Sequence, residues 1–199
     1  MFANHIQRDA AHTAMPWANG GGVTYEVAAF PVGADLASFY WRISMAEVRE
    51  PGAFSAFTGI DRVLTVLGPG DLLLFVNGVE TRSRKHVPFA FSGDDDVRAE
   101  LVDGPITDLN VMTRRGQCRA EVHVLTISES VDLEPIVASD TIIVVLSGEF
   151  TVVDGAHLNE RDVLFLNQAA SVTGSGVIAH IIITATPPST ANSLSSRDA

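Results

Sequence analysis

The chain has 199 residues, of which 46% are hydrophobic and 19% are charged, and its formal net charge is −11 at pH 7. This is the composition of a packed globular protein, and its acidity disfavours nucleic acid, whose phosphates require clustered Lys and Arg. No apolar run approaches the roughly 18 residues of a membrane span, and the N-terminus lacks the apolar core of a signal peptide. Because Cys118 is the only cysteine, no intrachain disulfide can form. We therefore expect a cytoplasmic protein with no membrane or nucleic-acid partner.

A glycine-rich segment, residues 15–24 (MPWANGGGVT), follows a short entry segment. Its three successive glycines allow backbone angles that other residues avoid, as a phosphate-binding loop requires. However, no Lys-Ser/Thr pair and no helix start follow them, because residues 25–30 have the pattern of a strand. The segment therefore indicates a tight turn at a sheet rim, or a turn in which Asn19 and the glycine amides line the mouth of a pocket.

Residues 41–62 (WRISMAEVREPGAFSAFTGIDR) form the most informative segment of the chain. At its start, apolar Trp41, Ile43 and Met45 alternate with Arg42, Ser44 and Ala46, which predicts a strand. A loop with aromatic and hydroxyl side chains follows, and Arg62 begins the next strand. Two arginines on strands, separated by such a loop, favour an anion-binding pocket over a catalytic triad or a metal site.

Short apolar runs separated by glycine-containing turns continue through the rest of the chain. Residues 63–76 predict a hairpin around Gly68-Pro69-Gly70, with Asn77-Gly78 closing a second turn. Residues 142–153 predict a similar hairpin around Ser147-Gly148, and this repeat indicates two related β units. Further strands are expected at residues 89–91, 98–102, 106–113, 121–127 and 178–184.

Helical periodicity is nearly absent, so the predicted fold is all-β, with two packed sheets or open barrels. We place an N-terminal half that carries the pocket at residues 1–104 and a C-terminal half at residues 105–186. Residues 187–199 are rich in Pro, Ser, Asn and Thr. Such a composition cannot bury enough surface to become ordered, so we expect a disordered tail.

Metal-dependent and nucleophilic chemistry find little support in the sequence. The six histidines are spaced neither as H-x-H nor as H-x3-H, so no metal and no other cofactor is expected. Cys118 has no histidine placed as its base, and Ser55 lacks the glycines of a nucleophile elbow. Some carboxylates stay open as acid/base candidates, although exposed and solvated acids are the simpler interpretation: Asp61 with Glu47, and Asp108 with Glu26.

Arg42 lies between Trp41 and Ile43 in a strongly apolar strand. A buried arginine must be paired or hydrogen-bonded, because an unmatched buried charge costs several kcal/mol. One interpretation is a salt bridge within the protein, and the other is a ligand contact. The candidate salt-bridge partners are Glu26, Asp61 and Asp108.

Arg62 follows a glycine-containing loop and precedes a strand. At such a position a guanidinium can point into the mouth of a barrel and bind a carboxylate through two parallel hydrogen bonds. Phe54, Phe57 and Trp17 supply the apolar wall that small-molecule pockets usually have, or they belong to the core. Arg62 is therefore the first candidate for ligand binding.

Four blocks carry a resemblance to a known family: 16–28 (PWANGGGVTYEVA), 39–48 (FYWRISMAEV), 52–70 (GAFSAFTGIDRVLTVLGPG) and 91–116 (FSGDDDVRAELVDGPITDLNVMTRRG). Their order and spacing resemble the HutD/Ves family. The resemblance implies a bicupin, that is, two cupin-like β-barrel or jelly-roll halves in one chain, which agrees with the internal repeat. It also implies a part in bacterial histidine utilisation, which members are thought to limit by binding urocanate or a formylated or formimino derivative of glutamate. No enzymatic activity is established for the family, and its members, like this chain, lack the usual cupin metal motif.

By position, Arg62 is similar to the pocket arginine of the family. The chain departs from the family pattern at Ala18, where many relatives have Lys, and at Leu109, where Phe is common. The missing lysine near the proposed mouth bears on which ligand is bound. The other polar signature positions that match are Asn19, Arg42, Ser55 and Asn110.

The expected protein is thus a bicupin without metal or cofactor that binds a small anionic ligand and modulates histidine breakdown. The alternatives are a metal-independent enzyme acting on such an acid, and an interaction or stress protein with a vestigial pocket. A barrel edge could also pair two chains into a homodimer. Arg62 is expected to hold the ligand carboxylate. The full set of expected ligand-binding residues is Arg62, Arg42, Asn110, Asn19, Ser55, Phe54, Phe57 and Trp17.

Overall fold

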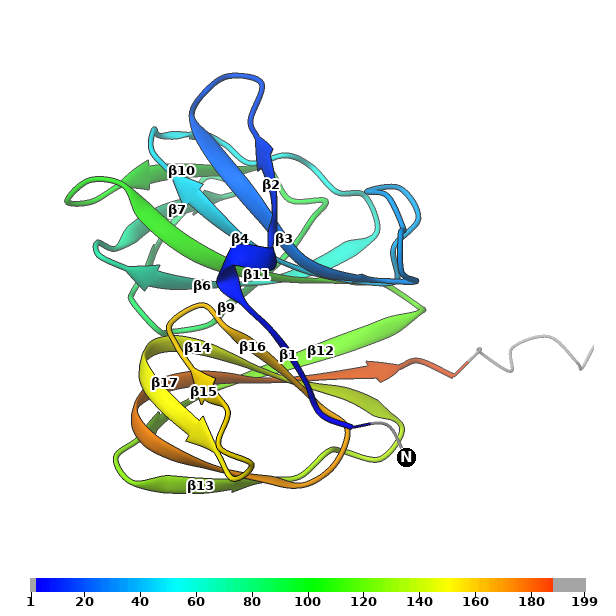
Figure 1. The fold of residues 1–199 in the computed structure, drawn as a ribbon. Helices are drawn as coiled ribbons and strands as arrows, with labels where there is room; N and C mark the ends of the chain where they lie inside the picture. The colour runs from blue at the N-terminus through cyan, green and yellow to red at the C-terminus, as the bar shows by residue number, and fades with distance from the viewer. Residues whose placement is uncertain (1–2, 188–199) are drawn as a thin grey trace, which may run out of the picture.

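The computed structural model describes residues 3–187, nearly all of them in β-strands and the turns between them (Figure 1). The only helix in this range is a single 3₁₀ turn, η1 (Asp9–Ala11). None of the described residues belongs to a helix long and apolar enough to span a membrane. The expected tail from residue 187 lies outside the described residues, apart from Pro187 itself.

The N-terminal half consists of two sheets packed face to face. Leu64 of the first sheet and Leu74 of the second are fully buried in the apolar cluster between them. The first sheet has six strands in the order β2 (Thr13–Pro16), β3 (Gly22–Phe30), β4 (Trp41–Val48), β11 (Ile106–Arg114), β6 (Ile60–Gly68) and β9 (Phe89–Ser92). The second has four strands in the order β5 (Gly52–Ala53), β10 (Val97–Leu101), β7 (Leu72–Val76) and β8 (Val79–Ser83).

The predicted turn at Asn77-Gly78 is confirmed. It joins β7 to β8 with Val76 paired to Val79, and both turn residues have positive φ, 50° and 80°. Such a two-residue turn matches the twist of the flanking strands, and Asn-Gly is its preferred sequence.

The C-terminal half is one seven-stranded sheet that encloses a core of its own (Figure 1). Phe150 and the aliphatic side chains around it fill this core. The main path runs through β1 (His5–Gln7), β16 (Val163–Leu166), β14 (Ser139–Val152), β17 (Ala170–Ala185) and β12 (Cys118–Ile127). Off this path, β13 (Ser130–Leu133) pairs with β17, and β15 (His157–Leu158) pairs with β14.

The two halves are stacked and share an apolar interface (Figure 1). Successive side chains of a strand point to opposite faces of the sheet. On β4 and β11 the odd-numbered residues, such as Ile43 and Leu109, therefore pack against Ile142 and Ile181 of the C-terminal half. The even-numbered residues point the other way, into the N-terminal half, which is where the predicted polar residues lie.

The boundary predicted between residues 104 and 105 does not match the strand pairing. β11 lies between β4 and β6 of the N-terminal half, and β1 pairs with β16 of the C-terminal half. The Gly104-Pro105 turn marks a change of sheet within one half. Partners of a strand that are distant in the sequence leave no local signal, so the turn alone suggested a domain boundary.

Both predicted hairpins are also wrong. The strands on either side of Gly68-Pro69-Gly70, β6 and β7, belong to different sheets, and Ser147-Gly148 is not a turn between two strands. β14 continues through this position, with a register shift between Val145 and Ser147. Gly148 has a φ of 86° and faces Gly176 on β17, and a Cβ on Gly148 would collide with the carbonyl oxygen of Ser175. Here glycine allows a bulge and a close approach of two strands, whereas the prediction took it as a turn.

Candidate functional site: a cavity with two arginines

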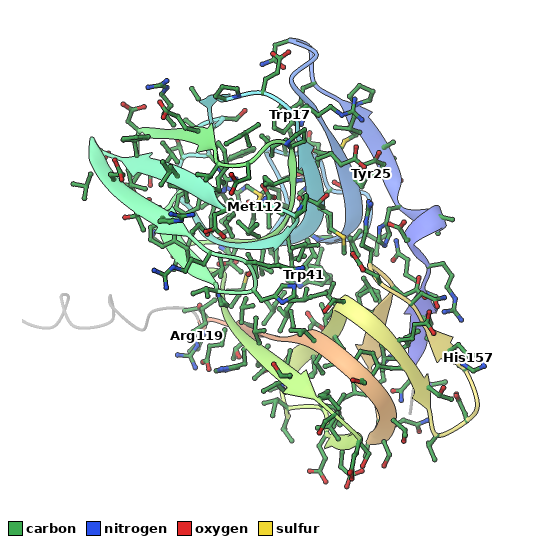
Figure 2. The ribbon with its side chains drawn as sticks, turned by 90° about the vertical axis from the view of Figure 1, so that its left-hand side faces the viewer. Trp17, Tyr25, Trp41, Met112, Arg119 and His157 are labelled. Carbon is green, nitrogen blue, oxygen red and sulfur yellow. The ribbon has the colours of Figure 1, made fainter. Side chains whose placement is uncertain are left out.

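A cavity of about 400 Å³ lies inside the N-terminal half. The inner face of the six-stranded sheet forms its floor, and the β2–β3 turn and the loop after β5 form its rim. In Figure 2, Met112, one of its lining residues, lies within this half, whereas Trp41 lies at the junction with the other half. The cavity brings together all eight residues predicted for ligand binding: Trp17, Asn19, Arg42, Phe54, Ser55, Phe57, Arg62 and Asn110.

The register of three neighbouring strands places both arginines on this floor. Met112 of β11 is paired with Arg42 of β4 on one side and with Arg62 of β6 on the other. Because neighbouring strands are about 4.8 Å apart, the backbones of the two arginines are about 10 Å apart. Two cations thus face one small cavity from the two sides of a methionine.

Arg62 is buried, with 7% of its surface exposed, yet it is in none of the ion pairs (N···O within 4.0 Å) found among residues 3–187. One terminal nitrogen donates to the Asn110 side-chain oxygen at 2.8 Å, and the other reaches the Ser55 backbone carbonyl at 3.5 Å. Burial lowers the pKa of Arg62 to about 10, so the guanidinium stays charged at neutral pH. The site therefore maintains a buried cation without a carboxylate in direct contact.

Three phenylalanine rings surround the Arg62 guanidinium. Its central carbon lies 5.2 Å from the centroid of Phe54, 5.5 Å from Phe57 and 4.8 Å from Phe91. The negative face of each ring attracts the cation, and the rings also fix its plane. Phe54 and Phe57 were predicted as the apolar wall, but Phe91 was predicted only as part of a strand.

Asn110 links Arg62 to a buried acid. Its side-chain oxygen accepts from Arg62, and its side-chain nitrogen donates to the carboxylate of Asp108, two residues earlier on the same face of β11. Asp108 is 1% exposed and also lines the cavity. The sequence had suggested Asp108 as an acid/base residue or a salt-bridge partner of Arg42, and the structure instead connects it to Arg62 through an amide.

Burial raises the pKa of Asp108 from 3.8 to about 7, and the charge of Arg62 and the hydrogen bond from Asn110 offset part of this effect. The cause is the cost of an ionised carboxylate in a poorly solvated site. Both protonation states of Asp108 are therefore accessible near neutral pH. This property would suit a proton-transfer residue, and it would also make an anion site sensitive to pH.

Replacing Asp108 with Asn is expected to stabilise the fold by an amount that grows from about pH 4 to pH 7 and is constant above. In this window the unfolded chain has released the proton, near 3.8, whereas the folded chain holds it up to about 7. The contribution of Asp108 to wild-type stability therefore falls as pH rises, by at most about 4 kcal/mol, and the Asn variant lacks this contribution. Urea unfolding of both proteins between pH 4 and pH 8 measures the difference. Parallel curves for the two proteins would contradict it.

Arg42 has partners of its own. Its Nε donates to Glu26 of β3 at 2.7 Å, and a terminal nitrogen donates to the Ser44 hydroxyl at 3.2 Å. Of the three predicted salt-bridge partners, Glu26 is thus the one observed. Asp61 points away from the cavity and pairs with Arg115 at 2.8 Å. Arg42 is neutralised within the protein, so Arg62 is the stronger attractor for an anion.

The rim is held by local hydrogen bonds. The Trp17 indole donates to the Thr24 hydroxyl at 2.8 Å, and the Asn19 side-chain oxygen accepts from the Gly21 amide at 3.0 Å. A Cβ on Gly22 would collide with the carbonyl oxygen of Glu47 and lie 3.0 Å from the Trp17 ring. The glycines thus allow the turn to approach β4 closely, as the prediction of a sheet-rim turn implied.

The two departures from the family pattern have different locations. Ala18 lies in the lining of the cavity, so the missing lysine changes the mouth itself. Leu109 is fully buried in the interface between the halves, on the opposite face of β11 from Asn110. The second departure therefore concerns packing, and only the first concerns the cavity.

Other candidate residues lie outside the cavity. No histidine of the described residues lines it, and the described chain contains no group of three or more His, Cys, Asp or Glu placed to hold a metal ion. Cys118 is buried in the interface, its thiol donates to the Tyr40 carbonyl, and burial raises its pKa. Lining residues that the sequence prediction of ligand contacts missed are Ala18, Thr24, Ser44, Ala46, Val48, Ala53, Asp108 and Met112.

The chain matches a family over most of its described length. The sequence model of the HutD family matches residues 9–180. Protein Ves of Citrobacter koseri is 43% identical over 110 residues, which are 54% of this chain and 56% of that relative. An uncharacterised 21.2 kDa protein of Pseudomonas putida, from the hutC 3′ region, is 40% identical over 112 residues, which are 55% and 57% of the two chains. The chain thus covers little more than half the length of these curated relatives.

Solved structures agree with the fold. A conserved protein of unknown function, PA5104 of Pseudomonas aeruginosa PAO1, and HutD of Pseudomonas fluorescens SBW25, described for a formate condition, each superpose with a TM-score of 0.80 at 28% identity. The superpositions include 92% and 93% of this chain, and 100% of each of the two solved chains. Bacterial pirin YhhW of Escherichia coli, at 12% identity and a TM-score of 0.64, shares the fold alone. A cupin 2 barrel protein of Leptotrichia buccalis, with a TM-score of 0.57, does so too, which confirms the predicted cupin-like architecture. The family match over residues 9–180 confirms the resemblance found in the sequence, and the chain belongs to the HutD family.

Proposed function

We propose that this protein binds a small carboxylate in the N-terminal cavity and thereby modulates bacterial histidine utilisation in the cytoplasm. The observation that carries the proposal is Arg62, a buried guanidinium between three aromatic rings to which no carboxylate of residues 3–187 is paired. A buried charge without a partner costs several kcal/mol. An anionic ligand would provide the negative charge that pairs with the Arg62 guanidinium and so offset this cost.

The size and lining of the cavity support a small ligand. Its volume of about 400 Å³ is at the lower end of the range typical for ligand pockets. In the proposed arrangement, Arg62 binds the carboxylate, and Arg42 with Asn110 binds a second polar group of the ligand. Trp17 and the loop phenylalanines form the apolar walls, and Asn19 and Ser55 lie at the mouth. The site as proposed needs neither a metal nor a cofactor.

The link to histidine utilisation rests on family membership and on the Pseudomonas putida relative from the hutC 3′ region. It favours urocanate, or a formylated or formimino derivative of glutamate, as the compounds to test first. Formate, named for the Pseudomonas fluorescens HutD structure, is the smallest carboxylate probe of the same site. Pairing of two chains along a barrel edge remains a prediction.

One observation favours a second candidate function, a metal-independent enzyme acting on the same kind of acid. Asp108 lines the cavity and has a pKa raised by burial to about 7, a value suited to general acid/base catalysis. Asp61 and Glu47, the other pair considered, are absent from the cavity lining.

Calorimetric titration of the purified protein with urocanate, N-formylglutamate and formate tests the proposal, while proton NMR of the same mixtures monitors turnover. We expect saturable binding of at least one compound with its spectrum unchanged after hours of incubation. Appearance of a product that is absent with Asp108→Asn would support the enzyme instead. Absence of binding for all three compounds would contradict the choice of ligand class.

A further inference from the structure

A buried carboxyl group, that of Asp108, lies in the cavity, and the binding of a carboxylate by Arg62 does not explain its presence there. It is 1% exposed, it lies on the cavity floor, and its hydrogen-bond donor among the described residues is the Asn110 amide. No arginine or lysine nitrogen of residues 3–187 approaches its carboxylate within 4.0 Å. A buried carboxylate without an ion pair is stable mainly in its neutral, protonated form.

The charged groups that face Asp108 are few. Arg62 of β6 reaches it through Asn110, and Arg42 of β4 is paired with Glu26 of β3. The two rim segments that line the cavity, 17–19 and 53–57, contribute no charged side chain from the described residues. The facing four-stranded sheet contributes Leu72, Leu74, Val97 and Ala99 to the buried core.

The charge of the cavity therefore depends on one proton. Arg42 and Glu26 neutralise each other, which leaves Arg62 and Asp108. With Asp108 ionised the cavity has no net charge, and with Asp108 protonated it has one positive charge. A carboxylate ligand beside an ionised Asp108 would place two anions in a poorly solvated cavity, where like charges repel strongly.

We propose that the cavity binds a carboxylate together with a proton, which is taken up from solvent and held by Asp108. This inference rests on the proposed function of the cavity as a carboxylate site. The proton leaves a hydronium ion or a buffer acid and forms an O–H bond on a carboxyl oxygen of Asp108, and no bond of the ligand changes. With one ligand carboxylate in the cavity, the net charge of the occupied cavity is zero. Protonated Asp108 also gains a donor, so it offers the ligand a hydrogen bond where the ionised form offers repulsion.

The coupling has a definite sign. An anion beside Asp108 favours its protonated form, so by linkage protonation favours the anion. The affinity for the carboxylate is highest below pH 7 and falls as the pH rises above that value. The increase in Kd then approaches tenfold per pH unit. Acidification of the surroundings would therefore fill the site at a constant ligand concentration.

Calorimetric titration with N-formylglutamate between pH 6 and pH 9 tests this inference, because this probe does not itself titrate in that range. Urocanate is less suitable, since its imidazole does. For the wild-type protein we expect Kd to rise about 50- to 100-fold over the range, with close to one proton taken up per ligand at pH 8. Proton uptake is measured by repeating the titration in triethanolamine and Tris, two buffers that are not anions and that differ in ionisation enthalpy.

Asp108→Asn is the decisive variant, because it keeps the shape of the side chain and removes its titration. Its Kd should vary less than threefold from pH 6 to pH 9, without proton uptake. Asp71→Asn is the matched control: it removes the same charge in the same half, from a residue outside the cavity lining that pairs with Arg82. It should keep the wild-type pH dependence.

The possible outcomes distinguish a failure of proton coupling from a failure of the proposed carboxylate binding. A wild-type Kd that is constant with pH, or a pH dependence that persists in Asp108→Asn, would overturn proton coupling while leaving carboxylate binding intact. If Arg62→Ala binds N-formylglutamate as tightly as the wild type at every pH, the proposed function itself fails. If N-formylglutamate does not bind, formate serves as the probe in the same series. Absence of binding by both at pH 6 would overturn both proposals.

Discussion

Replacing Arg62 with Ala is expected to weaken the binding of a small carboxylate about 50-fold. A charge-assisted, two-point contact in a desolvated pocket contributes about 2–3 kcal/mol, and each 1.4 kcal/mol corresponds to tenfold in Kd. The three rings around the guanidinium fix its plane before a ligand arrives, so little conformational entropy is lost on binding. Calorimetry at pH 6 with the compound that the wild-type protein binds most tightly measures the loss.

Arg62→Lys provides the control for charge. Lysine keeps the positive charge but cannot bind a carboxylate through two parallel hydrogen bonds, and its ammonium cannot stack between rings as a guanidinium does. We expect its Kd to lie between those of the wild type and Arg62→Ala. Equal affinity of the wild type and Arg62→Ala, with both proteins folded by circular dichroism, would remove Arg62 from the site.

Replacing Leu109 with Ala is expected to lower the free energy of unfolding by about 2–5 kcal/mol, the cost of a large cavity in a well-packed core. Leu109 is fully buried where the N-terminal half packs on the C-terminal half. For a domain of this size the loss corresponds to a decrease in melting temperature of roughly 5–15 °C. Because both halves share this interface, the transition should shift as a whole.

Two comparisons sharpen the Leu109 experiment. Val137→Ala, at a residue that is 92% exposed, should change stability by less than about 0.5 kcal/mol. Leu109 lies on the opposite face of β11 from Asn110, so the folded Leu109→Ala variant should bind its ligand with nearly unchanged affinity. A melting temperature within 1 °C of the wild type would show that the interface contributes little, contrary to its complete burial.

The family, the fold class and the gathering of the polar residues could be predicted from the sequence because they depend on local patterns. Alternation along residues 41–46 separates the side chains of β4 that face the cavity from those that face the other half. The family resemblance then selected Asn19, Ser55 and Asn110, and the structure places all of them in the lining. Their role in binding a ligand stays a prediction.

What the sequence could not show depends on pairing between distant strands. The place of β11 between β4 and β6 follows from long-range register, and only this register puts Met112 between the two arginines. The stack of Phe91 on Arg62 has the same origin, since residue 91 of β9 is paired with Arg62 across the sheet. Nothing in the sequence distinguishes Asp108 from the other acidic residues, and only its burial in the structure does so.

Gly148 shows a different limit of local patterns. A Ser-Gly pair between apolar runs is typical of a turn, yet β14 passes through it. The decisive fact is the facing Gly176, because the two glycines together allow their strands to approach more closely than side chains would permit. No pattern within residues 142–153 contains that information.

The most direct test of the central claim, that Arg62 makes the cavity a carboxylate site, is a thermal-shift panel of small carboxylates with the wild type and Arg62→Ala. A ligand at 100 times its Kd stabilises the folded state by about 2.7 kcal/mol, which raises the melting temperature of a protein of this size by roughly 5–10 °C. We predict such a rise for the wild type with urocanate, N-formylglutamate or a related acid. The Arg62→Ala variant should show a much smaller rise. No rise for any acid of the panel, or equal rises in both proteins, would contradict the account.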